Sequence, residues 1–408
     1  MARPSGLETL PMNGRRFVLM LVVLLSGFAP VAWGAALPDD VRQSSSALAI
    51  RQRIQAFLTD QMKDLSGADP TAQSTAKDAI VAEVQPSGTV KPSDIFLDTY
   101  AAEVDNALKP ALTSKDVRVR LNAAVIAARV AERANNTRLV PTVLALLKDE
   151  NEAVVLWAVK ASKYLIPPVL NAAATAQAAA PRGGGSGSGA GGAGAANAAQ
   201  PPQIPLIQAL VAAATKFANS GPVVESAYNS LQIEQAATNV PQANWSFAVP
   251  VVVKAIQDIM AVRIDLYKTG IPDMPQVDPK VGNFLVVSGG VWKNAPAQQV
   301  QTIQLLSNMI SLAGQRVALT PDRTKKEELI TGVIKPTGGH LVVIGRSGTP
   351  GFNGLEAAAK PVSDLGAASA ETQVTNLTSG LFAELKKVPK LASLQAPPTI
   401  SSSTAANP

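Results

Sequence analysis

Apolar side chains recur at helical spacing over residues 93–170, and the pattern comes in two similar halves. In the first half an apolar residue occupies every third or fourth position up to Leu112, which places these side chains on one face of a helix. A short polar turn at 113–116 follows, and then a run rich in Val and Ala at 117–131. This spacing predicts two helices joined by a tight turn. The apolar positions of the first helix are Ile95, Leu97, Tyr100, Val104, Leu108 and Leu112.

The same two-helix pattern returns 35 residues later. A leucine-rich run at 139–147, an acidic turn at 149–151 and an apolar run at 153–161 repeat the order of the first half. A supersecondary unit that recurs at a fixed short period is the signature of a helical-repeat solenoid. An ordinary helical bundle with chance self-similarity is the alternative. The aligned pairs are Val104 with Leu139, Leu108 with Val143, Leu112 with Leu147, Val119 with Val154, Leu121 with Leu156 and Ala123 with Ala158.

The polar positions of the two second helices align at a different offset. They match at 34 residues rather than 35, which predicts that the turn of the second unit is one residue shorter. With that shift, Trp157 is expected opposite Ala123 on a packed flank.

The second helix of the first unit carries Val119-Arg120 followed by Ala123-Ala124. Together with the leucine-rich helix and the Lys/Asp turn before it, this run resembles the HEAT-repeat family, with armadillo and lyase-like repeats close behind. The second unit departs from the family pattern because the arginine is missing, and the period is shorter than the roughly 40–47 residues usual for the family. The resemblance implies that the second helices line one continuous surface, which is the usual binding face.

The rest of the chain continues the helical pattern around a break in composition. Residues 40–180 form an N-terminal repeat region, and residues 181–203 are rich in Gly, Ala and Pro, so they are predicted to be a flexible linker. Helical patterns resume over 204–320 and again over 321–390, whereas the Ser-, Ala- and Pro-rich residues 391–408 are predicted to be disordered. We therefore predict an all-α fold: a two-helix repeat solenoid with a flexible Gly-rich insertion and a C-terminal helical region.

Some helix boundaries in the second half are also predicted. Long helices are expected over 249–269 and 297–313. A capping box, in which Thr324 precedes Glu327 by three residues, is predicted to open a helix that runs through Ile334.

The first 36 residues have the layout of a secretory signal peptide. Arg15-Arg16 precede an uncharged apolar run at 17–28, and a proline and small residues follow. Cleavage is expected after Gly34 or after Ala36, since either position has a small residue two places before it. The alternative is an uncleaved anchor, because residues 17–37 carry no charge and are long enough to span a membrane. The protein is thus expected to be secreted or periplasmic, with a membrane as partner only if this segment stays attached.

Composition excludes several functional classes. The chain has 36 Lys+Arg and 30 Asp+Glu, and loss of residues 1–36 would remove three arginines and one glutamate, which lowers the formal net charge from +6 to +4. Such a mild and scattered charge excludes a typical nucleic-acid binder. The absence of Cys excludes disulfides and thiolate sites, and a single His excludes multi-histidine metal sites. No cofactor or metal is expected.

The single histidine, His340, lies in a strand-like apolar run that enters a glycine-rich loop at 337–354. A phosphate or dinucleotide site has this outline, but the G-x-G-x-x-G spacing is absent. Ser347 and Asp364 are near in sequence but lack the setting of a nucleophile elbow. We therefore expect a loop between helices or a short hairpin, and an envelope enzyme that uses His340 is an alternative function.

Asp273 and Asp278 lie among prolines and suggest a pair of catalytic carboxylates. Aspartate next to proline more often stabilises a turn, so turn residues are expected here.

The second helices of the two clear units carry five basic residues on one stripe, against Glu152 as its acidic member. We expect a non-catalytic scaffold that binds an acidic protein segment, or an anionic envelope polymer, through contacts that salt weakens. A solvated face that binds nothing is the alternative. The candidate partner-binding residues are Arg118, Arg129, Arg133, Lys160 and Lys163.

Overall fold

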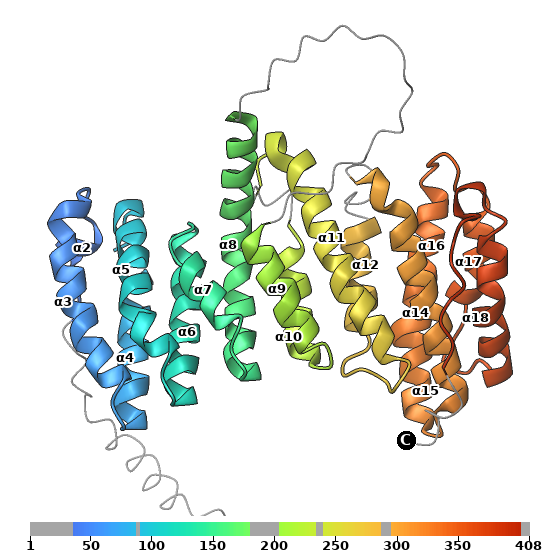
Figure 1. Ribbon diagram of the computed structural model, residues 1–408, viewed down its shortest axis with the longest axis horizontal. Helices are drawn as coiled ribbons and strands as arrows, with labels where there is room; N and C mark the ends of the chain where they lie inside the picture. Colours follow the sequence, from blue (N-terminus) through green and yellow to red (C-terminus); the bar gives the residue numbers. More distant parts are fainter. Residues whose placement is uncertain (1–35, 87–89, 180–203, 234–239, 287–294, 401–408) are drawn as a thin grey trace, which may run out of the picture.

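A computed structural model describes residues 36–86, 90–179, 204–233, 240–286 and 295–400. These residues form helices and no β-strand, so the predicted all-α class is confirmed. The helices stand side by side in one extended row (Figure 1). The expected leader over 1–36, apart from Ala36, and the expected linker over 181–203 lie outside the described residues.

The helices form two layers, and each helix of one layer pairs with a helix of the other. Neighbouring helices within a layer also contact each other, so the packing is continuous from α3 to α16. The first layer holds α3 (Ala47–Leu65), α5 (Asp94–Leu112), α7 (Val140–Leu146), α9 (Pro205–Lys216), α11 (Gln242–Leu266) and α14 (Gln299–Leu319). The second layer holds α4 (Pro70–Ala82), α6 (Val117–Ala134), α8 (Glu152–Ala179), α10 (Gly221–Leu231), α12 (Val277–Val286) and α16 (Lys335–Arg346).

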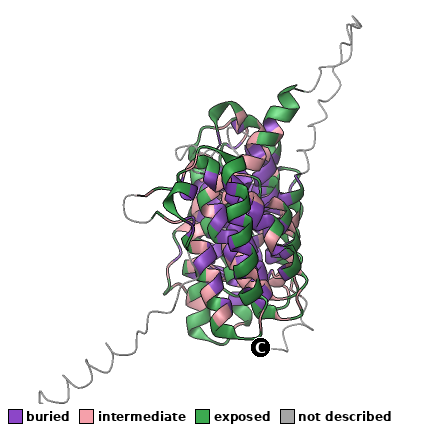
Figure 2. Cartoon of the chain, turned by 90° about the vertical axis from the view of Figure 1, so that its left-hand side faces the viewer, coloured by how far each residue is buried: buried purple, intermediate pink, exposed green. Residues whose placement is uncertain are grey.

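Further helices close the ends of the row. The short helix α2 (Asp39–Arg42) precedes α3, whereas α17 (Leu355–Ser363) packs on α16 and α18 (Glu371–Leu385) packs on α14. Buried residues lie between the layers and exposed residues on the outer surfaces (Figure 2). This arrangement is consistent with the helical-repeat solenoid predicted from the 35-residue period.

Five of the six aligned repeat pairs share the same burial, and in the sixth Leu112 is partly buried whereas Leu147 is buried. Leu108 and Val143 are buried, as are Ala123 and Ala158, whereas Leu121 and Leu156 are both partly buried against the core. Most equivalent residues of the two units therefore pack in the same way.

A polar side chain caps the N-terminus of several second-layer helices. Asp116 accepts a hydrogen bond from the Arg118 amide, and Asn151 accepts from the amides of Ala153 and Val154. Helices α6 and α8 consequently begin at equivalent points, 35 residues apart. The prediction of a shorter second turn is therefore wrong: long charged side chains do not fix the register of a helix, whereas caps do. Trp157 aligns with Asn122, not with Ala123, and both are partly exposed.

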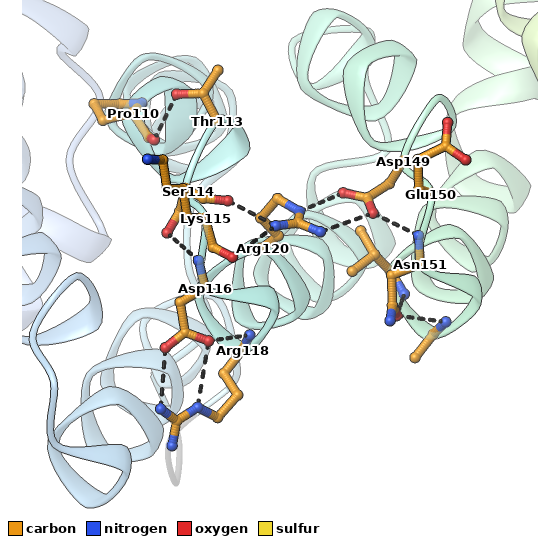
Figure 3. A network of polar contacts seen from close by, with 12 residues as sticks. Pro110, Thr113, Ser114, Lys115, Asp116, Arg118, Arg120, Asp149, Glu150 and Asn151 are labelled. Carbon is orange, nitrogen blue, oxygen red and sulfur yellow. Dashed lines mark hydrogen bonds and ion pairs between the residues drawn. The ribbon is translucent and has the colours of Figure 1, made fainter.

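Arg120 joins the turns of the two units (Figure 3). Its Nε lies 2.6 Å from Oδ2 of Asp149 in the next unit, and its Nη1 lies 2.7 Å from the carbonyl oxygen of Ser114 in its own turn. Both members of this ion pair are largely buried. The arginine of the Val-Arg motif thus fixes one unit against the next.

The C-terminal region differs from the prediction in its helix starts. Asp322, rather than Thr324, caps α15 (Arg323–Leu329), and its Oδ1 accepts from the amides of Thr324 and Lys325. The helix continues through a π-helical turn at Ile330–Ile334 into α16. Residues 337–344 are therefore helical, which corrects the expected strand-like run, because packing against α12, α14 and α17 outweighs the poor helix propensity of Gly338 and Gly339.

The prediction of disorder does not hold for residues 391–400. Leu391 and Leu394 are buried. Two glutamines of α14 hold the backbone that follows: Gln304 bonds to both the amide and the carbonyl of Gln395, and Gln315 bonds to the carbonyl of Pro398 and the amide of Ile400. Residues 401–408 lie outside the described part of the chain.

Among the described residues, α8 is the one helix long and apolar enough to cross a membrane. Just over half of its most apolar stretch, 56%, is buried inside the helical array. A buried core helix can have the same length and apolar composition, so these two properties do not distinguish a membrane span from a core helix here.

Candidate binding pocket between α6, α8 and α10

The second layer has a hollow of about 310 Å³ where α6, α8 and α10 meet. Because α8 packs between the other two helices, side chains from three different units converge there. The lining residues are Ala128, Arg129 and Glu132 of α6, Trp157, Lys160, Lys163 and Tyr164 of α8, and Ser226, Asn229 and Ser230 of α10.

Trp157 lies at the centre of the basic groups of this pocket. The guanidinium carbon of Arg129 is 5.5 Å from the centre of the Trp157 ring, and the ammonium nitrogen of Lys160 is 4.6 Å from it. Both distances are within the range of a cation–π interaction. The ring therefore holds two cations from neighbouring helices close together, although their charges repel.

A second aromatic residue, Tyr164, continues the pocket along α8. The ammonium nitrogen of Lys163 is 5.9 Å from the centre of its ring. Burial, together with the charge of Glu132, raises the pKa of the Tyr164 hydroxyl above its usual value of 10.0, so this group stays neutral and can donate a hydrogen bond. A smaller hollow of about 110 Å³ continues from Lys163 and Tyr164 toward Gln232.

Positive charge exceeds negative charge in the pocket. Glu132 is the single carboxylate among the lining residues, and its Oε2 lies 3.2 Å from Nη1 of Arg129. Lys160 and Lys163 have no carboxylate partner among the described contacts and are exposed. Two positive charges therefore remain available to a ligand beside two aromatic rings.

Three of the five basic residues predicted from the sequence meet in this pocket: Arg129, Lys160 and Lys163. The other two face elsewhere. Arg118 pairs with the cap residue Asp116 at 3.1 Å, and Nη2 of Arg133 donates to Oε1 of Gln85 at 2.7 Å. The predicted strip is thus divided into a central pocket and two ends that have partners of their own.

Sequence reasoning missed Trp157 and Tyr164 as pocket residues. Their spacing from the lysines was a usable signal, because Trp157 and Lys160, and likewise Lys160 and Tyr164, are three or four residues apart on one helix face.

His340 lies inside the helical array, on α16. Its Nε2 lies 2.8 Å from the carbonyl oxygen of Pro279, and the ring packs against Gly282, where a β-carbon would come within 2.3 Å of Cδ2. Burial lowers the pKa of His340 below its usual 6.5. Ser347 and Asp364 are engaged with Thr349 and Lys360, so the described contacts do not join the three into a triad.

Asp278 belongs to a buried cluster between α10, α11 and α12, whereas Asp273 is exposed at its edge. Asp278 is fully buried and accepts hydrogen bonds from Arg263 and from the Tyr228 hydroxyl, the latter at 3.0 Å. The carboxylate of Asp273 accepts from the amide of Gly221. The expectation of a turn residue is wrong for Asp278, which lies in the first turn of α12 and balances the buried charge of Arg263.

The described residues contain no group of three or more acidic or histidine side chains placed to hold a metal ion. No protein-family profile matches the chain, and no curated protein or solved structure is significantly similar to it.

Proposed function

We propose that this protein is an exported helical-repeat scaffold of the HEAT type that binds an acidic segment of a partner protein in the pocket between α6, α8 and α10. The observation that carries the proposal is the meeting of Arg129, Lys160 and Lys163 around Trp157 and Tyr164. The features that support it are structural and electrostatic, and no catalytic group is assigned.

The chemistry of the pocket favours a peptide that combines acidic and apolar side chains. Carboxylates would pair with Lys160 and Lys163, which lack a described acidic partner. An apolar or aromatic side chain would pack on the exposed part of Trp157 and the adjoining Tyr164. The hollow is open and continues toward Gln232, so it accommodates an extended segment.

The repeat type and the export are supported by separate observations. The Arg120 to Asp149 ion pair links consecutive units, which gives the Val-Arg motif behind the HEAT resemblance a structural purpose. The basic, apolar and small-residue succession of residues 15–36 supports export.

The test is fluorescence anisotropy with a short labelled peptide rich in Asp and Glu that contains one Phe. The double variant Arg129→Glu/Lys160→Glu is expected to weaken binding at least about tenfold, because two attractive contacts become repulsive. The matched control, Arg118→Glu/Arg138→Glu, changes the net charge equally, but both residues are exposed and paired outside the pocket. The control is expected to bind nearly as the unmodified protein does.

Three results would contradict the proposal. Equal losses for the two variants would mean that net charge alone attracts the peptide. Equal binding of a peptide with Asn and Gln in place of Asp and Glu would exclude an acidic partner. Binding of a soluble anionic polysaccharide but not of the peptide would assign the pocket to an envelope polymer.

A further inference from the structure

The described part of the chain begins at the edge of a buried carboxyl group. Leu37, which precedes α2, is 7% exposed, and its backbone nitrogen donates to Oε1 of Glu83 at 3.0 Å. Glu83 follows the end of α4 and is 4% exposed. The residue before this contact, Ala36, is exposed. Leu37 is therefore the first buried residue of the described part of the chain, and its backbone nitrogen is bonded to Glu83.

Glu83 has fewer partners than a buried carboxylate requires. Its second oxygen, Oε2, is buried without a hydrogen-bond partner. The nearest cation is Arg42, whose Nε is 3.9 Å from Oε2, but its hydrogen bonds go to the backbone carbonyls of Glu83 and Gln85. Burial consequently raises the pKa of Glu83. A buried carboxylate with one free oxygen is costly unless another donor, preferably a charged one, supplies the missing contact.

The sequence places a processing signal directly before Leu37. For a cut after Ala36, Ala36 is the last residue of the signal peptide and Gly34 lies two residues before it. A signal peptidase requires small residues at both of these positions. Hydrolysis of the Ala36–Leu37 bond consumes one water, leaves a carboxylate on Ala36 and leaves an amine on Leu37. This amine is largely protonated at neutral pH, since its ordinary pKa is about 7.7–8.0.

We propose that the chain is cut between Ala36 and Leu37 and that Glu83 is the receptor of the new N-terminal ammonium group. The nitrogen is already 3.0 Å from Oε1, and the ammonium group carries three N–H donors in place of one. One donor retains the bond to Oε1 and another is available to Oε2. Cleavage after Gly34 would instead leave two residues, about 7 Å of extended chain, between the charge and Glu83.

This inference rests on the export proposed above and not on the pocket. Cleavage would then have a structural consequence, because the new ammonium group of Leu37 forms an ion pair with Glu83 at the end of α4. The contact with Glu83 also selects one of the two cleavage positions that the sequence leaves open.

The first experiment compares two chains with defined N-termini, one starting at Leu37 and one at Ala35, each with and without Glu83→Gln. In the chain that starts at Leu37, Glu83→Gln removes an ion pair and is expected to raise the unfolding equilibrium constant about tenfold more than in the other chain. Glu103→Gln is the matched control, because Glu103 is also buried and pairs with Arg51 and not with the segment before α2. It is expected to affect both chains equally.

A second measurement does not depend on the variant folding. The α-amino group of the chain that starts at Leu37 is expected to titrate above the range for a free N-terminus and to react slowly with amine reagents. Equal effects of Glu83→Gln in both chains, or an ordinary amine pKa, would overturn the receptor role.

The third measurement is the mass of the protein recovered from the periplasm of a bacterial host. A chain that starts at Leu37 is the expected result. A chain that starts at Ala35 would overturn this cleavage position and leave export standing. A chain that keeps its leader would overturn the cleavage, and a chain found in the cytoplasmic fraction and not in the periplasm would overturn the export as well, without bearing on peptide binding in the pocket.

Discussion

Two clusters of this protein each combine an arginine, an acidic residue and a tyrosine, and yet they differ in burial and in hydrogen bonding. In the pocket, Arg129 of α6 pairs with Glu132, and Tyr164 lies beside them. Between α10, α11 and α12, Arg263 of α11 pairs with Asp278, and the Tyr228 hydroxyl donates to the same carboxylate. Each cluster thus consists of an arginine, an acid and a tyrosine contributed by neighbouring helices.

The difference between them is the number of partners and the access of water. Arg263 is fully buried, and its donors reach the Asp278 carboxylate and the carbonyl oxygens of Ala218 and Asp273. The side chain of Arg129 is 48% exposed. A fully paired buried cation fixes the positions of helices, whereas an exposed cation over an aromatic ring remains available to a ligand. Residue type alone therefore does not indicate a binding site. A binding site is indicated by access of solvent and by charged groups that still lack hydrogen-bond or ion-pair partners.

The largest difference in stability between the two clusters is expected when their arginines are replaced. Arg263→Met is expected to lower the free energy of unfolding by about 3–5 kcal/mol, because Asp278 remains buried without its cation. Arg129→Met is expected to cost less than about 1 kcal/mol, since its ion pair is exposed. Urea denaturation followed by circular dichroism measures both. Losses of similar size would contradict the distinction.

Replacing the two tyrosines gives a smaller contrast. Tyr228→Phe deletes a hydrogen bond to a buried carboxylate and is expected to cost about 1.5–3 kcal/mol. Tyr164→Phe acts at a partly exposed position and is expected to cost less than about 0.5 kcal/mol. If Tyr164→Phe proves the costlier, the hydroxyl in the pocket is structural and is not a ligand group.

Acid is expected to weaken the buried region around His340. His340 contacts Pro279, next to Asp278, and burial lowers the pKa of its imidazole. Below pH 6.5 the imidazole therefore binds a proton more readily in the unfolded chain than in the folded chain. Its contribution to stability is therefore complete above pH 6.5 and is lost as the pH falls below that value, by at most about 1.4 kcal/mol per pH unit.

The measurement for this pH effect is the urea midpoint at pH 5, 6 and 7 for the unmodified protein and for His340→Gln. The difference in slope between the two reports His340 alone, because other carboxylates titrate in both. Parallel curves would show that His340 takes up its proton without penalty in the folded state.

Lys160→Gln is expected to separate stability from affinity. This lysine is exposed and contacts the Trp157 ring, so its loss is expected to change the free energy of unfolding by less than about 1 kcal/mol. Affinity for the acidic peptide is nevertheless expected to fall severalfold. A loss of stability without a loss of affinity would remove Lys160 from the binding surface.

Much of the fold could be predicted from the sequence because helices follow local rules. The apolar spacing before Leu112, the turn at 113–116 and the 35-residue period all concern residues close together in the chain. The structure bears out the all-α class and the burial of the aligned positions such as Ala123 and Ala158. The register of the second unit was missed because charged side chains were aligned in place of the caps Asp116 and Asn151.

The tertiary structure alone decided which residues meet. It brought Arg129 to Trp157 from the preceding unit, paired Asp278 with Arg263 in the core, and laid residues 391–400 along α14 through Gln304 and Gln315. The sequence determined the helices, because hydrogen bonding and side-chain spacing act within a few residues. The partners of each side chain depended on how those helices pack and on which groups are removed from water, and neither is encoded in a local pattern.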